Sequence, residues 1–284
     1  MMPKLRSMNI KRKFLLAGSA SLGLACATLA AMGAAAQSQA SIPDFSSNGT
    51  SWQTNNGGEF IAVPGSPAPV RQDPAHPFVP NGQGKQPTYR IADLTDPNLK
   101  QWAKDIMKKD NDEVLAGKIA FTPASSCKPA GVPAFMLAGG PYYFVQSSKE
   151  VVIITQGDHQ VRRIHLDVPH SANPKPSWYG ESVGHYEGDA LVVDTIGLST
   201  QSFVDNYRTP HTEKLRVVER WKMAEGGKTL EVVMRIEDPN TYNQPWQAVQ
   251  RYRRVQQPMI EEVCAENNQH LFDYHIPIAA KPDF

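Results

Sequence analysis

The segment 181–195 constrains the fold more than any other part of the chain. It reads ESVGHYEGDALVVDT, two short alternating strands joined by a turn at Glu187, Gly188 and Asp189. Gly adopts positive φ angles freely and Asp tolerates turn geometry, so this trio suits a tight hairpin. The flanking segments repeat the alternation and predict strands near 142–147, 149–156, 160–168, 181–187, 189–195, 213–224, 228–238 and 247–257.

Short links join most of these strands. Ser147-Ser148, Gly157-Asp158 and Gly226-Gly227 supply turn residues, and the one long connection spans 196–212. About eight consecutive strands of this kind predict a mainly β protein, an antiparallel up-and-down barrel whose closure removes exposed edges. An eight-stranded barrel is just wide enough inside to hold one small ligand.

One helix is predicted beside the barrel, over residues 95–116. Thr95 or Asp96 can cap it, and Pro97 suits the first helical position because its missing N–H has no partner to lose there. The apolar side chains that share one face at helical spacing are Leu99, Trp102, Ile106 and Met107. We expect this helix to support the side of the sheet.

The N-terminus predicts a cleavable signal peptide over 1–36. A basic run, Lys11-Arg12-Lys13, precedes an apolar stretch that ends in the small residues Ala34-Ala35-Ala36. An uncleaved membrane anchor is the alternative, and the choice between Sec and twin-arginine export stays open. We therefore expect a periplasmic or secreted protein with no stable membrane span after processing. An extended lead-in rich in Pro, Gly and Ser then covers 37–94, and the helix and barrel form one domain over 95–284.

Export would leave two cysteines in the mature chain, Cys127 and Cys264. In an oxidising compartment such a pair predicts one disulfide, which would join the segment entering the sheet to the segment leaving it. Two buried free thiols, or one reactive thiol, are the competing interpretation.

The net charge and the absence of metal-binding and phosphate-binding motifs limit the classes of partner and cofactor that we expect. The net charge is +1, with no basic run outside the N-terminus, so we expect no nucleic-acid partner. The sequence holds no HxH, HExxH or CxxC pattern and no Gly-rich phosphate loop, so we predict no metal and no cofactor.

Gly180, Ser182 and Gly184 have the spacing of a nucleophile elbow, but a second strand follows them where an elbow needs a helix. A serine hydrolase stays a minor alternative.

Charged side chains interrupt the apolar face of two predicted strands. Glu219 shares its face with the apolar residues of 213–224, Arg162 does so within 160–168, and Asp194 ends the strand 189–195. One interpretation is that all three reach into the barrel and serve in ligand contact or acid–base catalysis. The other is a structural Arg–Glu pair that fixes the register of the strands.

Loop histidines and aromatic residues complete the candidate site. His159 lies in a turn at the barrel rim, and His211 lies where the long loop re-enters the sheet, positions at which barrel sites open. These two, with Glu219 and Arg162, are the candidate catalytic residues. The candidate substrate-binding residues are Asp194, Trp178, Ser182, Trp221 and Tyr252.

The run from Trp178 to Gly197 resembles a family of exported bacterial proteins without an established function. Its members share a pattern close to W-x-G-x-S-x-G-x-[WY]-E-G-D-x-L-V-V-D-T-x-G, and the likeness extends over roughly residues 120–268. His185 stands where the family often carries Arg, which argues against a catalytic role for it. By analogy, the resemblance implies a lipocalin-like barrel.

The leading functional hypothesis is an exported small-molecule enzyme of lyase, hydratase or isomerase type, working by cofactor-free acid–base chemistry on a partly apolar or aromatic substrate. His159 or His211 would move the proton, Glu219 would assist, and Arg162 would hold an anionic group. The first alternative is a periplasmic binding or carrier protein that uses the same cavity without catalysis. The second is a structural envelope protein with a filled barrel.

Overall fold

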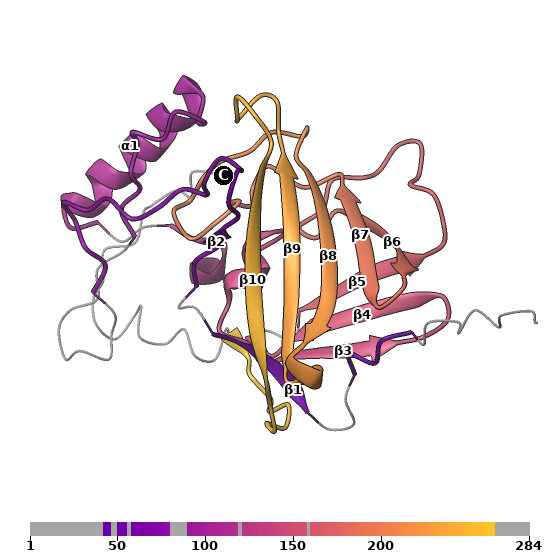
Figure 1. Ribbon diagram of the computed structural model, residues 1–284. Helices are drawn as coiled ribbons and strands as arrows, with labels where there is room; N and C mark the ends of the chain where they lie inside the picture. The colour runs from indigo at the N-terminus through magenta and orange to yellow at the C-terminus, as the bar shows by residue number, and fades with distance from the viewer. Residues whose placement is uncertain are drawn as a thin grey trace, which may run out of the picture. The chain divides into compact units, whose positions relative to one another are not determined.

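The alternating segments of the sequence form the strands of a closed β-barrel (Figure 1). The computed structural model describes residues 42–46, 50–55, 58–79, 90–118, 121–157 and 160–264. Its strands are β1 (Ser51–Thr54), β2 (Ile61–Ala62), β3 (Tyr142–Gln146), β4 (Glu150–Thr155), β5 (Val161–Leu166), β6 (Glu181–Glu187), β7 (Ala190–Ile196), β8 (Arg216–Ala224), β9 (Thr229–Glu237) and β10 (Trp246–Val255). The signal peptide predicted over 1–36 lies outside the described residues.

Nine strands close the ring, which confirms the predicted mainly β barrel with one helix. Their order is β1-β3-β4-β5-β6-β7-β8-β9-β10, and β1 also pairs with β10. Trp52 of β1 lies opposite Tyr142 of β3 on one side and Arg254 of β10 on the other. The strand β1, which completes the ring, and the short strand β2 both come from the lead-in. Strand β2 pairs with Ala248 and Val249 of β10, a different part of that strand from the part that pairs with β1.

The pair β5 and β6 departs from the expected antiparallel pattern. These strands run parallel, with Ile164 opposite Ser182 and Leu166 opposite Gly184. The segment 167–180 carries the chain back between them. A parallel connection needs about a dozen residues or more, which this segment supplies. The prediction of an entirely up-and-down barrel is therefore wrong here, because a period of two reports which side chains share a face and not the strand direction.

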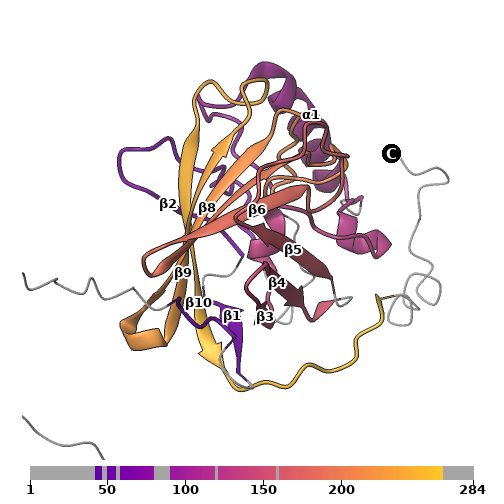
Figure 2. The ribbon, with the colours of Figure 1, turned by 90° about the vertical axis from the view of Figure 1, so that its right-hand side faces the viewer.

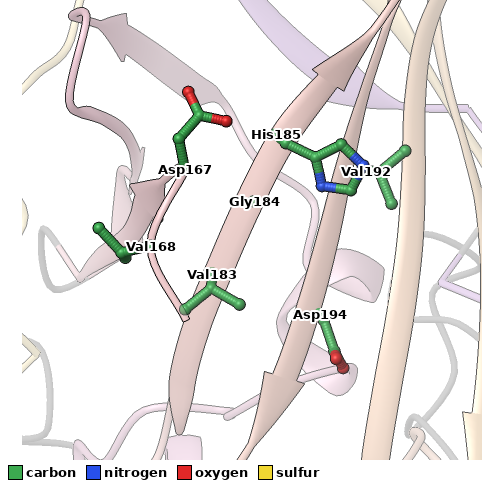
Figure 3. A pocket seen from close by; sticks show the side chains of 7 residues that line it. All are labelled: Asp167, Val168, Val183, Gly184, His185, Val192 and Asp194. Atoms are coloured by element: carbon green, nitrogen blue, oxygen red, sulfur yellow. The ribbon is translucent and has the colours of Figure 1, made fainter. Parts of the chain in front are cut away.

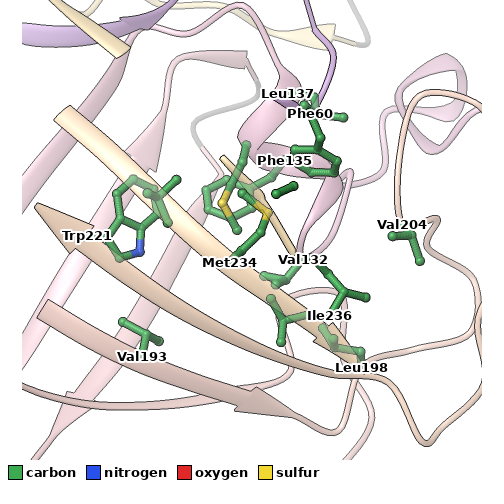
Figure 4. Packing of buried hydrophobic residues seen from close by; sticks show 14 of the residues in the cluster. Phe60, Val132, Phe135, Leu137, Val193, Leu198, Val204, Trp221, Met234 and Ile236 are labelled. Carbon is green, nitrogen blue, oxygen red and sulfur yellow. The ribbon is translucent and has the colours of Figure 1, made fainter. Parts of the chain in front are cut away.

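Large aromatic side chains fill the barrel. Trp221 stacks on Tyr252 with ring centroids 5.8 Å apart, and Tyr142 meets Tyr252 edge-on at 5.1 Å. Phe144 contacts the other side of this group, 5.6 Å from Trp221. Figure 4 shows that strand residues such as Met234 share one cluster with side chains from the loops. The interior is thus a packed core. The number of predicted strands indicates room for one small ligand, but aromatic side chains occupy this space.

A short 3-10 turn, η3 (Ala134–Leu137), packs into this core through the buried Phe135 and Met136. The hydroxyl of Tyr252 donates to the carbonyl of Met136 at 3.0 Å. The hydroxyl of Tyr142 donates to the carbonyl of Phe135. Buried tyrosine hydroxyls need such partners. These bonds help to fix η3 against the barrel wall. The carbonyl of Met136 also accepts from the side-chain amide of Gln250, and that of Phe135 also accepts from the backbone amide of Ala138.

The helix α1 (Gln101–Leu115) lies outside the ring of strands (Figures 1 and 2). It begins later than predicted, because Lys100 is its N-cap and Asp96 accepts from the backbone of Asn98 in a preceding turn. Its buried positions are Ala103, Met107 and Asn111, so the packing face differs from the predicted one, and Ile106 is exposed. Within the described residues, no helix is long and apolar enough to cross a membrane.

The predicted disulfide is present. Cys127 and Cys264 are bonded, with their Cα atoms 5.6 Å apart and 137 positions apart in sequence. Cys127 follows the 3-10 turn η2 (Pro123–Ser126), and Cys264 ends the segment that leaves β10 and runs outside the barrel (Figure 2). The bond therefore ties the segment that enters β3 to the segment that leaves β10, although β1 and β2 come earlier in the chain than both cysteines.

Candidate functional site

Two of the predicted catalytic residues, Arg162 and Glu219, form an ion pair inside the barrel. Each of two guanidinium nitrogens of Arg162 lies 2.8 Å from a different carboxylate oxygen of Glu219. Their exposed fractions are 1% and 0%. Such two-pronged contacts match the fork of the guanidinium and are among the strongest pairs that proteins form.

Three further side chains complete this buried network. The guanidinium of Arg162 also donates to the hydroxyl of Ser182 at 3.1 Å and to that of Thr195 at 2.8 Å. The indole N–H of Trp221 donates to Glu219 at 2.8 Å. Both charges are therefore paired and hydrogen-bonded, as buried charges must be. The arrangement matches a structural cross-link, and ligand contact here would require breaking it.

The other predicted residues lie in different places. His211 is buried in the loop before β8, where its Nε2 lies 2.9 Å from the Ser202 hydroxyl and its Nδ1 lies 3.0 Å from the Thr212 carbonyl. Burial lowers the pKa of His211. Both ring nitrogens are thus engaged away from Arg162 and Glu219. His159 lies outside the described residues.

The remaining substrate-binding candidates do not converge on one cavity. Trp178 is half-buried, and its carbonyl accepts a bond of 3.2 Å from the amide of Val132. Ser182, Trp221 and Tyr252 point into the packed core, where the contacts described above hold them.

Asp194 lies on the outer face of β7, and its neighbour Thr195 takes the inward position. Its two carboxylate oxygens accept from Nε and Nη2 of Arg216 at 2.9 and 2.8 Å. The pKa of Arg216 is raised by this contact. The expectation that Asp194 joins Arg162 and Glu219 inside the barrel is therefore wrong.

A pocket of about 370 Å³ opens on this outer face, and we call it the outer-face pocket (Figure 3). It forms where the chain leaves β5 after Leu166 while β6 and β7 continue. Asp167 makes the departure with a φ of 55°, a left-handed angle that Asp tolerates better than most residues. The pocket is lined by Asp167, Val168, Val183, Gly184, His185, Val192 and Asp194.

A histidine and a carboxylate stand together at one side of the outer-face pocket. The Nε2 atom of His185 lies 2.9 Å from a carboxylate oxygen of Glu187 on the same face of β6. The other oxygen of Glu187 accepts from Arg220. These bonds from His185 and Arg220 lower the pKa of Glu187. A carboxylate that orients an imidazole in this way is a common arrangement in acid–base sites.

A second histidine borders the pocket through Asp194. His170 lies between two carboxylates, with Nδ1 3.0 Å from Glu181 and Nε2 3.5 Å from Asp194. The amide and hydroxyl of Ser171 also donate to Glu181 at 2.7 and 2.6 Å and lower its pKa. These contacts fasten the start of the 167–180 segment to the sheet beside the pocket.

Within the described part of the chain, no group of three or more His, Cys, Asp or Glu side chains is arranged to hold a metal ion. The outer-face pocket instead combines carboxylates, an imidazole and three valines, which suits a small organic molecule. In comparisons with known proteins, no family model matches the chain and no curated protein matches it.

Proposed function

We propose that the protein binds a small molecule in the outer-face pocket. The observation that carries this proposal is the pocket of about 370 Å³, which falls within the ordinary size range of ligand sites. Val168, Val183 and Val192 offer an apolar surface, while Asp167 and His185 add polar groups beside it. A few polar groups around an apolar surface are typical of sites that orient a ligand.

The contacts inside the barrel support placing the ligand outside it. Arg162 and Glu219 are paired to each other and to Ser182, Thr195 and Trp221. A ligand that bound there would have to separate two buried charges, at a cost of several kcal/mol. The proposal therefore keeps the binding function of the sequence hypothesis and moves it to the outer-face pocket.

The site of action that we propose is the periplasm or the extracellular space. The basic and apolar N-terminal run and its small-residue end support export. The disulfide between Cys127 and Cys264 supports it independently, because such bonds persist in oxidising compartments and are rare in the cytosol.

Thermal-shift screening of a small-molecule collection tests the binding function. Ligands of the pocket should raise the melting temperature of the wild type and lose this effect in Val183→Trp, whose indole would fill the pocket. Val233→Trp is the matched control, since Val233 is a half-buried valine on the outer face of β9, a strand that lines no part of the pocket. Hits that shift Val183→Trp as much as the wild type would place binding elsewhere and contradict the proposal.

Acid–base catalysis in the same pocket is a second candidate, and the contact between His185 and Glu187 favours it. The imidazole is held through Nε2, and a base so oriented can take a proton from a bound carbon or oxygen acid. His185 stands where the resembling family often has Arg, so this lyase- or isomerase-type chemistry would be a property of this chain rather than of that family.

Solvent-exchange NMR tests this candidate. A hit from the screen is incubated with the protein in D2O, and the loss of its C–H signals is followed over time. Catalysis predicts exchange with the wild type, and loss of exchange in His185→Gln with binding retained. Binding without any exchange in the wild type would support the binding function alone and contradict catalysis in the pocket.

A further inference from the structure

We infer that the ligand of the outer-face pocket carries a cationic amine, which the carboxylate of Asp167 binds. The inference rests on the proposed function and adds the chemical class of the ligand. It follows from which polar groups of the pocket are already engaged by protein partners, and from the balance of charge around it.

Two of the three polar side chains that line the pocket are engaged. Both oxygens of Asp194 accept from Arg216, and Nε2 of His185 contacts Glu187. The carboxylate of Asp167 has no hydrogen bond or ion pair with any residue that the structure describes. It is therefore the charge that a ligand can pair with while every protein contact of the pocket stays in place.

The backbone holds Asp167 in position for this role. Its amide donates to the carbonyl of Gly184 at 2.9 Å, which anchors it to β6, and its positive φ turns the chain away from the sheet. Figure 3 shows Asp167 and His185 on either side of Gly184. Because the backbone of Asp167 is fixed, only its short side chain has to be ordered when a ligand binds.

The charge around the pocket favours a cation. Among the described residues, three carboxylates line the pocket or contact its lining, and two of them have an arginine partner. Asp194 pairs with Arg216 and Glu187 pairs with Arg220, which leaves the negative charge of Asp167 without one. His170 and His185 add positive charge only when protonated. An anionic ligand would meet this excess of carboxylates and be repelled.

The apolar lining of the pocket indicates what the rest of the ligand is made of. Val168, Val183 and Val192 present hydrocarbon and no hydrogen-bonding group. A compact apolar body would cover these valines while its amine reaches Asp167. The class that fits is a small primary amine with an apolar or aromatic body.

Three benzyl compounds that differ in charge test the inference on the full chain. Benzylamine, benzyl alcohol and benzoate share a ring of one size and are titrated separately at pH 7 by calorimetry and NMR. We expect benzylamine to bind about fivefold more tightly than benzyl alcohol, since Asp167 is exposed and charge pairs at exposed sites contribute up to about that factor. Benzoate should bind more weakly than either.

Asp167→Asn should reduce the preference for benzylamine over benzyl alcohol to about twofold or less, since it removes the charge and keeps the shape. Asp189→Asn is the matched control, because Asp189 is an exposed carboxylate that pairs with Lys222 and lies outside the pocket. It should leave the preference unchanged.

Two results would overturn the inference. Equal or tighter binding of benzyl alcohol or benzoate by the wild type would reject the amine and leave the binding function intact, provided that Val183→Trp abolishes that binding. If none of the three compounds binds while the screen finds other ligands of the pocket, the amine class is again rejected. A screen without any pocket ligand would reject the proposed function itself.

Discussion

Arg162 on β5 and Glu219 on β8 are joined by two contacts of 2.8 Å, although two other strands separate them around the barrel. The intervening strands contribute Ser182 and Thr195, which both accept from the same guanidinium. The network therefore links four consecutive strands from inside. It includes the pair β5 and β6, whose parallel ladder is short.

Replacing Glu219 with Gln should destabilise the protein by about 3–5 kcal/mol, because it leaves the buried guanidinium of Arg162 without a counter-charge. Urea unfolding followed by tryptophan fluorescence and circular dichroism measures the loss. The double variant Arg162→Met with Glu219→Leu is the control, and it should lose less than Glu219→Gln because no charge remains buried. A Glu219→Gln protein within about 1 kcal/mol of the wild type would contradict the structural role of the pair.

Two neighbouring residues of β7 should respond differently to removal of a hydrogen-bonding group. Thr195→Val deletes a hydroxyl that accepts from Arg162 in the core, and we expect a loss of about 1–3 kcal/mol. Asp194→Asn weakens an ion pair with a half-exposed arginine on the outer face, and we expect about 0–1 kcal/mol. Equal losses in urea unfolding would contradict the assignment of the two faces.

The sequence predicts the barrel well because period-two alternation is strong over most strands. It identifies Arg162 and Glu219 as inward charges, since the other residues of the same phase are apolar while the opposite phase of each strand is mainly charged or polar. It fails at Asp194 because β7 is apolar in both phases, with Leu191 and Val193 in one and Ala190 and Val192 in the other. Alternation alone then cannot tell which of Asp194 and Thr195 points inward.

The outer-face pocket could not be predicted because it depends on strand direction. It exists where β5 ends beside the continuing β6, and the parallel pairing of these strands follows from the return of the 167–180 segment. The sequence pattern places Asp167 and Val168 at the end of the strand predicted over 160–168. The available signal was the length of that connection, which exceeds a hairpin and suits a crossover.

Removing the disulfide through Cys127→Ser with Cys264→Ser should lower stability by about 2–4 kcal/mol, because the bond closes a long loop and restricts the unfolded chain. Urea unfolding of the wild type with and without reductant should show the same difference, and reductant should not affect the double variant. A count of two free thiols in the non-reduced mature wild type would contradict the bond.

His211 should make the stability of the protein depend on pH near neutrality. Burial lowers the pKa of its imidazole in the folded state below the ordinary value of 6.5. The unfolded chain therefore binds a proton at a higher pH than the folded chain, and stability falls as the pH drops below 6.5 towards the folded-state pKa. His211→Gln removes this titration and keeps a side-chain amide that can hydrogen-bond with the Ser202 hydroxyl, which also donates to the Ser199 carbonyl.

Urea midpoints measured from about pH 8 down to about pH 5 separate this effect from others. The wild type should lose stability faster than His211→Gln over that range, although the variant starts from a lower value. Burial raises the pKa of Asp110 and Asp205, but both carboxyl groups titrate in both proteins, so their contributions cancel in the comparison. Parallel pH profiles for the two proteins would mean that His211 ionises equally in the folded and unfolded states, contrary to its burial against Ser202 and Thr212.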